Sequence, residues 1–118
     1  MNEAELKSRL KQFALRTMRL VRHLPKSAEG RAIAGQLVRC GTAVGANYRS
    51  ACRARSKAEF VARLGIAEDE ADECVYWLEL IIDGGVMEKQ RVQPLLGEAN
   101  EIVAILTASH KSAGHRRE

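Results

Sequence analysis

Positively charged side chains that could bind phosphate are concentrated in the first half of this sequence of 118 residues. Residues 1–57 hold 13 Lys or Arg and three acidic residues, whereas residues 58–85 hold one Arg and eight acidic residues. A face rich in Lys and Arg can bind the phosphate backbone of a nucleic acid. The candidate phosphate-binding residues are Lys7, Lys11, Arg16, Arg19, Arg22, Arg49, Arg53 and Arg55.

The same separation of charge also fits ion pairing between basic helices and the acidic residues at 68–73, within one chain or between copies. The basic residues near the expected hinge fit a subunit edge equally well: Arg49, Arg53, Arg55 and Lys57. Exposed ion pairs contribute only about 0–1 kcal/mol each, so pairing alone would not explain so large an asymmetry. Aromatic residues make up 4% of the chain, which argues against stacking on single-stranded bases. Any binding should therefore be directed at the backbone and should weaken with salt.

The acidic residues at 68–73 suggest a metal site, but the supporting ligands are missing. Di-iron bundles combine inward-facing Glu residues with Glu-x-x-His pairs, and this sequence has no Glu-x-x-His. His23, His110 and His115 fall near expected helix ends or in the tail. There is also no phosphate-binding loop, nucleophile elbow or zinc-ligand spacing. We expect no metal, no cofactor and no enzymatic activity.

Helices must position these side chains, because apolar residues recur at steps of three and four along most of the chain. We expect helices at residues 3–23, 28–53, 57–83 and 88–111, followed by a frayed tail at 112–118. Four amphipathic helices with short connections predict one all-α domain, an up-down-up-down antiparallel four-helix bundle.

Several residues mark the expected helix ends. Ser27 is a suitable N-cap for the second helix. Ser56 and Glu59 match a capping box at the start of the third helix. Pro94 interrupts the pattern of the fourth helix, so that helix either begins near Pro94 or is kinked there.

Three residues of the second helix conflict with helix propensity. A glycine inside a helix costs about 1 kcal/mol relative to alanine, so Gly41 and Gly45 predict the close approach of another helix. Asn47 is also disfavoured in mid-helix, and if buried it must be hydrogen-bonded. We expect Asn47 to bond an acidic side chain or the backbone of the third helix and so to fix the register. A contact with a ligand is the alternative.

The third helix has apolar residues on a second side, away from its main buried seam. They are Ile66, Tyr76, Trp77 and Leu80. In a chain of this size such a surface is often covered by another subunit, so these residues form a candidate oligomer interface. Trp77 is interpreted as a core or interface residue rather than a platform for stacking bases.

The cysteines and the N-terminal residues predict a cytoplasmic protein. Cys40, Cys52 and Cys74 fall inside expected helices and form no disulfide framework. The charged N-terminus lacks the apolar core of a signal peptide. No apolar run approaches the roughly 20 residues that span a bilayer, so we expect no membrane contact.

A combination of short motifs runs from about Leu24 to Gly85. It comprises Gln36-Leu37-Val38-Arg39, Asn47, the polar residues 53–57, Glu59-Phe60, Leu64-Gly65-Ile66-Ala67, residues 68–73, Tyr76-Trp77-Leu78-Glu79 and Gly84-Gly85. This combination resembles the four helix bundle protein family, whose members are also called 23S rRNA intervening-sequence proteins. The chain departs from many members after Asn47, where it has Tyr48-Arg49-Ser50-Ala51 in place of a Ser-rich segment.

The resemblance implies a four-helix bundle that assembles as a ring-shaped homopentamer, and no enzymatic activity is established for the family as a class. The accessory protein of diversity-generating retroelements is similar in build and works with a reverse transcriptase and nucleic acid. We therefore expect a non-enzymatic, oligomeric accessory protein that binds RNA or DNA backbone, with copies of itself, nucleic acid or another protein as partners. The alternative is a structural or protein-binding scaffold without nucleic-acid contact.

Overall fold

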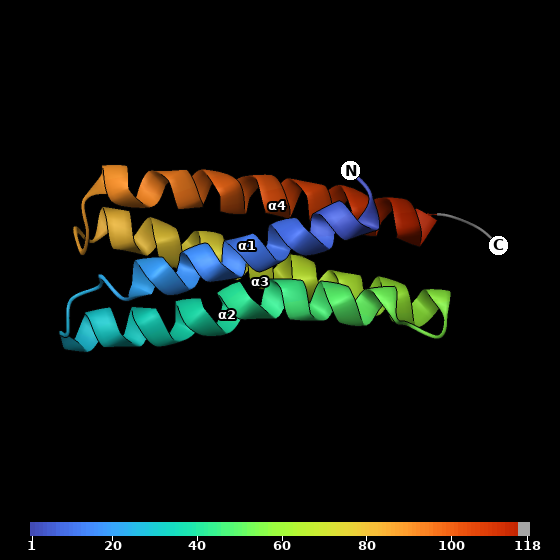
Figure 1. The fold of residues 1–118 in the computed structure, drawn as a ribbon, viewed down its shortest axis with the longest axis horizontal. Coiled ribbons are helices and arrows are strands. Elements are labelled where there is room, and N and C mark those ends of the chain that lie inside the picture. Colours follow the sequence, from blue (N-terminus) through green and yellow to red (C-terminus); the bar gives the residue numbers. More distant parts are fainter. Residues whose placement is uncertain (116–118) are drawn as a thin grey trace.

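In the computed structural model, which describes residues 1–115, four helices run antiparallel to one another in sequence order (Figure 1). They are α1 (Glu3–Val21), α2 (Ala28–Cys52), α3 (Lys57–Asp83) and α4 (Lys89–His115). The fold is therefore the all-α four-helix bundle that the apolar periodicity predicts, and it measures 51 × 20 × 20 Å. The start of α1 and the α2–α3 connection lie at one end of the bundle, the hinge end (Figure 1).

The helix ends differ from the prediction in α1 and α4. Helix α1 ends at Val21, two residues early, with Arg22 as its C-cap. Helix α4 continues to His115, so residues 112–115 are helical and not frayed; residues 116–118 of the predicted tail lie outside the described residues. Because α4 begins at Lys89, the helix does not start at Pro94, which is exposed in the second turn.

Side-chain caps fix the starts of the helices. The Ser56 hydroxyl accepts from the Glu59 amide at 3.1 Å, as the capping-box motif predicts. The Glu59 carboxylate, however, accepts from the amide of Arg55 at 3.1 Å, so the box is only half formed. Asn2 and Glu5 form a complete capping box at the start of α1, with hydrogen bonds of 2.8 and 2.9 Å.

Apolar side chains from all four helices form one core. The largest of those that are fully buried are Phe13, Leu10, Leu37, Leu64, Leu78, Ile81, Ile102 and Leu106. Each contributes about 1.5–3 kcal/mol relative to an exposed side chain, so the core accounts for the helices better than their propensities do. Cys40 and Cys74 are buried in this core as free thiols. None of the helices described here is long and apolar enough to cross a membrane.

The glycines of α2 allow α1 to approach closely, which confirms their predicted role. A Cβ atom at Gly41 would lie 2.7 Å from Cγ2 of Thr17. A Cβ atom at Gly45 would lie 3.4 Å from Cβ of Leu10 and 3.6 Å from its carbonyl carbon. Thr17 is fully buried, and its hydroxyl donates to the carbonyl oxygen of Phe13 at 2.8 Å. This contact holds the basic residues of α1 beside those of α2.

The side chain of Asn47 binds within its own helix. Its amide donates a hydrogen bond of 2.9 Å to the carbonyl oxygen of Ala43, one turn earlier on α2. The predicted bond to α3 is therefore wrong. Asn47 is only half-buried, so a local backbone acceptor is sufficient for its amide.

Replacing Asn47 by alanine should change the free energy of unfolding by less than about 1 kcal/mol in either direction. The variant loses one local hydrogen bond and gains helix propensity, two effects of similar size. Urea unfolding at a fixed protein concentration measures the difference. A loss of about 2 kcal/mol or more, the cost of leaving a buried polar partner unsatisfied, would show that Asn47 fixes the register after all.

Ion pairs connect neighbouring helices. Arg9 of α1 donates to the two carboxylate oxygens of Glu98 on α4 at 2.7 and 2.8 Å. These hydrogen bonds hold the pKa of Glu98 below its usual range. Arg39 of α2 pairs with Glu70 and Glu73 of α3, which confirms the predicted pairing of a basic helix with these two acidic residues.

Candidate phosphate-binding site

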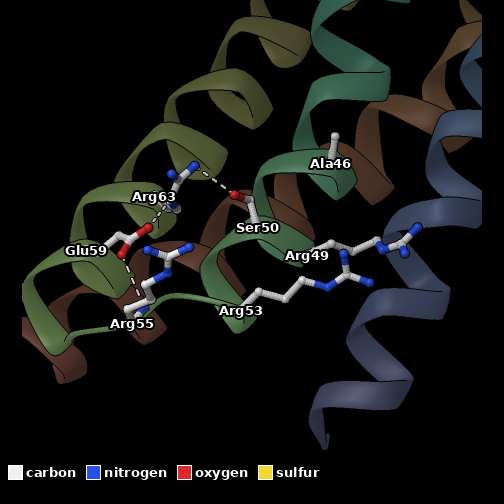
Figure 2. A pocket seen from close by; sticks show the side chains of 7 residues that line it. All are labelled: Ala46, Arg49, Ser50, Arg53, Arg55, Glu59 and Arg63. Carbon is white, nitrogen blue, oxygen red and sulfur yellow. Dashed lines mark hydrogen bonds and ion pairs between the residues drawn. The ribbon is translucent and has the colours of Figure 1, made fainter.

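A pocket of about 660 Å³ opens at the hinge end, between the end of α2 and the start of α3 (Figure 2). Four of its side chains are guanidinium groups, and only one is a carboxylate. The lining residues are Ala46, Arg49, Ser50, Arg53, Arg55, Glu59 and Arg63. A concave surface with this excess of positive charge favours an anionic ligand.

Arg63 is held in a fixed position in this pocket. Its Nε donates to Oε1 of Glu59 at 3.1 Å, and its Nη1 donates to Oγ of Ser50 on α2 at 2.7 Å. The Arg55 amide and then Arg63 hold the pKa of Glu59 below its usual range, so this carboxylate stays ionised at neutral pH. Because a guanidinium has five N–H donors, Arg63 can keep these bonds and still donate to a ligand.

The other three arginines of the pocket are exposed and form no ion pair with any residue in 1–115. Arg49 and Arg53 are one helical turn apart, about 6 Å along the axis of α2. Figure 2 shows both side chains extending from α2 toward α1, while Arg55 lies nearer to Glu59. No existing ion pair must be broken before Arg49 or Arg53 binds a phosphate.

A groove of about 510 Å³ between α1 and α2 continues from this pocket and shares Ala46, Arg49 and Arg53 with it. Lys7 and Lys11 of α1 also line it, together with the arginines of α2. The remaining lining residues are mostly small: Ser8, Leu10, Ala14, Thr42 and Gly45. The pocket and the groove together form the hinge-end site.

The structure brings five of the eight candidate phosphate-binding residues into the hinge-end site. They are Lys7, Lys11, Arg49, Arg53 and Arg55. Lys7 is the one of these five that forms an ion pair with a described residue, Glu3, at 2.9 Å.

The other three candidates lie farther along α1, away from the hinge end. Arg22 is exposed at the end of α1. Arg19 lines a separate pocket of about 200 Å³ together with Arg91 of α4. Arg16 is half-buried, and its charge helps to lower the pKa of Glu98, after the larger effect of Arg9.

Arg63, Ser50 and Glu59 are parts of the site that the charge pattern did not reveal. Arg63 is the single basic residue in an acidic segment, and Ser50 contacts it from the helix before the hinge. Glu59 and Arg63 are four residues apart on one helix, and this spacing could have predicted their ion pair. The contact with Ser50 depends on how α2 and α3 fold back on each other.

The candidate oligomer interface lies on the outer face of α3. Ile66 and Tyr76 are 46% and 54% exposed, and Trp77 and Leu80 are half-buried. The indole Nε1 of Trp77 donates to Glu73 at 3.1 Å, and its ring meets that of Tyr76 edge to face at 5.2 Å between centroids. The exposed Ile66 and Tyr76 therefore leave apolar area on this face that no described residue covers.

A separate polar cluster connects α3 to α4. Glu68 accepts a hydrogen bond from Thr107 at 2.8 Å and lies 2.8 Å from Nδ1 of His110. Gly65 leaves room for the His110 ring, since a Cβ atom there would lie 3.1 Å from Nε2. Among the described residues, no three His, Cys, Asp or Glu side chains are grouped so that they could hold a metal ion.

Comparisons with known proteins agree with this architecture. The family model for the 23S rRNA-intervening sequence protein matches residues 2–108. A crystal structure of a protein of unknown function from the S23 ribosomal protein family of Bacteroides thetaiotaomicron is similar over 89% of this chain and 97% of its own chain. The two are 33% identical in sequence, with a TM-score of 0.82. No curated protein matches the chain.

Proposed function

This chain belongs to the 23S rRNA-intervening sequence protein family, and we propose that it is a non-enzymatic accessory protein that binds the phosphate backbone of RNA or DNA at its hinge-end site. One observation carries the proposal. Arg49, Arg53 and Arg55 are exposed and form no ion pair with a described residue, beside Arg63, which is already fixed in position. Elsewhere in the bundle, Arg9 and Arg39 are already held by carboxylates.

The lining of the site indicates what it would recognise. No aromatic side chain lines the pocket or the groove, so unstacked bases would find no platform there. Guanidinium groups donate paired hydrogen bonds to phosphate oxygens, and the lysines add positive charge. Such contacts position a nucleic acid and carry no sequence information. The proposed activity is backbone binding with little sequence preference.

The test is a titration of the protein with labelled duplex and single-stranded RNA and DNA at two salt concentrations. Binding should weaken steeply as salt rises, because each phosphate contact releases counterions. Changing the base sequence at constant length should have little effect. Absence of binding at the lower salt concentration would refute the proposal and favour the alternative, a structural or protein-binding scaffold.

We also propose that the chain assembles with copies of itself through the outer face of α3. The supporting observation is the exposure of Ile66 and Tyr76 beside the half-buried Trp77. The assembly that the family resemblance implies is a ring of five copies.

Replacing Ile66 and Tyr76 together by glutamate should reduce the molar mass in solution to that of a single chain. The two carboxylates would be buried without partners in an interface, whereas they remain hydrated on a monomer. Light scattering measures the mass, circular dichroism checks helix content, and Ala108→Glu on α4 is the control. A wild-type protein that is already monomeric would contradict the proposed assembly.

A further inference from the structure

We propose that the nucleic acid is a duplex that lies lengthwise along α1 and reaches a second cationic site at the opposite end of the bundle. This inference rests on the proposed function of the hinge-end site and adds the form and direction of the ligand. Helix α1 is almost free of negative charge, because the sequence has no acidic residue between Glu5 and Glu29. The same stretch holds seven basic residues: Lys7, Arg9, Lys11, Arg16, Arg19, Arg22 and Lys26.

Four of these residues share one face of α1. At about 100° per residue, Lys7, Lys11, Arg22 and Arg19 fall within an arc of about 120°. The last three are exposed, and none of the three pairs with a described carboxylate. From Lys7 to Arg22 the helix rises about 22 Å, so the four cations form a stripe that begins in the hinge-end site, with Leu15 and Met18 between Lys11 and Arg19.

Helix α1 ends beside the α3–α4 connection, opposite the hinge end (Figure 1). Arg19, His23 and Arg91 line the pocket of about 200 Å³ there. A neighbouring pocket of about 700 Å³ shares His23 and Arg91 and adds Lys89, with one carboxylate, that of Glu88. Arg91 and Lys89 come from the first turn of α4, are exposed, and form no ion pair with a described residue. We call these two pockets the loop-end site.

The distance between the two sites favours a duplex over a single strand. Successive phosphates of one strand in a duplex are about 3.4 Å apart along its axis. The length of the stripe therefore equals about seven such spacings. A duplex is straight over this distance because its persistence length is about 500 Å. A single strand would have to be ordered along the stripe, and no Phe, Tyr or Trp side chain lines either site to stack its bases.

The experiment compares two DNA hairpins, with stems of about 6 and about 16 base pairs, chosen because the bundle is 51 Å long and a base pair rises about 3.4 Å. Arg19→Gln with Arg91→Gln should weaken binding of the long stem about tenfold or more and reduce its salt slope by about two. Binding of the short stem should change much less, because the hinge-end site that can hold it is intact in this variant. A longer stem offers more positions at which the protein can bind. Comparing variant with wild type on the same hairpin removes this difference.

Two controls separate this inference from the proposed function. Lys111→Glu changes the net charge by the same two units on α4, next to His110, which faces α3. Arg49→Gln with Arg53→Gln should weaken binding of both stems.

If Arg19→Gln/Arg91→Gln and Lys111→Glu reduce the affinity for the long stem equally, the lengthwise path is wrong. This holds even if the Arg49/Arg53 variant loses binding. A single strand of equal length that binds as tightly as the long stem, and loses as much in the Arg19/Arg91 variant, would overturn the choice of a duplex. A protein that binds neither hairpin would overturn the proposed function as well.

Discussion

Replacing Arg49 and Arg53 together by glutamine should lower the affinity for duplex nucleic acid about 100-fold at constant salt. Hydrogen bonds from charged groups contribute about 1.5 kcal/mol or more each, and about 1.4 kcal/mol corresponds to a factor of ten in affinity. Both side chains are exposed and make no ion pair with a described residue, so the substitution removes phosphate contacts and no structural ones. Fluorescence anisotropy with a labelled duplex measures the loss.

The matched control for this pair is Lys111→Glu, which changes the net charge by the same amount. Its affinity should fall only slightly, because Lys111 lies on α4 outside the hinge-end site. The urea midpoint of the double variant should equal that of the wild type. If the double variant and the control bind equally well, long-range attraction by net charge accounts for binding, and the hinge-end site does not.

Replacing Gly41 by valine should destabilise the bundle by about 3 kcal/mol, the upper end of the cost of overfilling a core. Even a Cβ atom at this position would lie 2.7 Å from Cγ2 and 3.1 Å from Oγ1 of Thr17. Thr17 cannot move aside easily, because it is fully buried and bonded to its own helix. Helix α1 would have to shift away from α2, and urea unfolding at a fixed protein concentration measures the cost.

Gly97→Ala is the control for the glycine substitution. Gly97 is exposed inside α4, and nothing lies within 4 Å of a Cβ atom added there. This change should stabilise the protein by up to about 1 kcal/mol through helix propensity alone. Adding Thr17→Ala to Gly41→Val should restore part of the lost stability. If Gly41→Val is as stable as the wild type, the helices do not approach as closely as the structure indicates.

The sequence could predict the helices, the core and the glycine contact because these depend on local spacing. Leu10, Phe13 and Leu37 are buried as their periodicity requires, and Gly41 faces α1 as its unfavourable propensity suggests. The partner of Asn47 could not be predicted in the same way. A half-buried amide has several acceptors within reach, and the carbonyl oxygen of Ala43 on its own helix is nearest in the chain.

Charge pattern alone also could not separate the binding arginines from the structural ones. Arg9 and Arg39 have the same residue type and similar helical surroundings as Arg49 and Arg53, but carboxylates of neighbouring helices bind the first two. Which arginine meets a carboxylate depends on the rotation of each helix in the bundle. For the same reason the sequence could not place Arg63 in the site, because its hydrogen bond to Ser50 depends on how α3 packs against α2.

Hydrogen–deuterium exchange with and without a saturating duplex tests the central claim most directly, because it locates the contact on the chain. The proposal predicts slower exchange at residues 49–63, which include the hinge amides, and around Lys7 and Lys11. Residues 68–80 of α3, which carry its acidic outer face, should exchange at an unchanged rate. Slower exchange confined to that face, or no change at the hinge while the duplex is bound, would contradict the assignment of the hinge-end site.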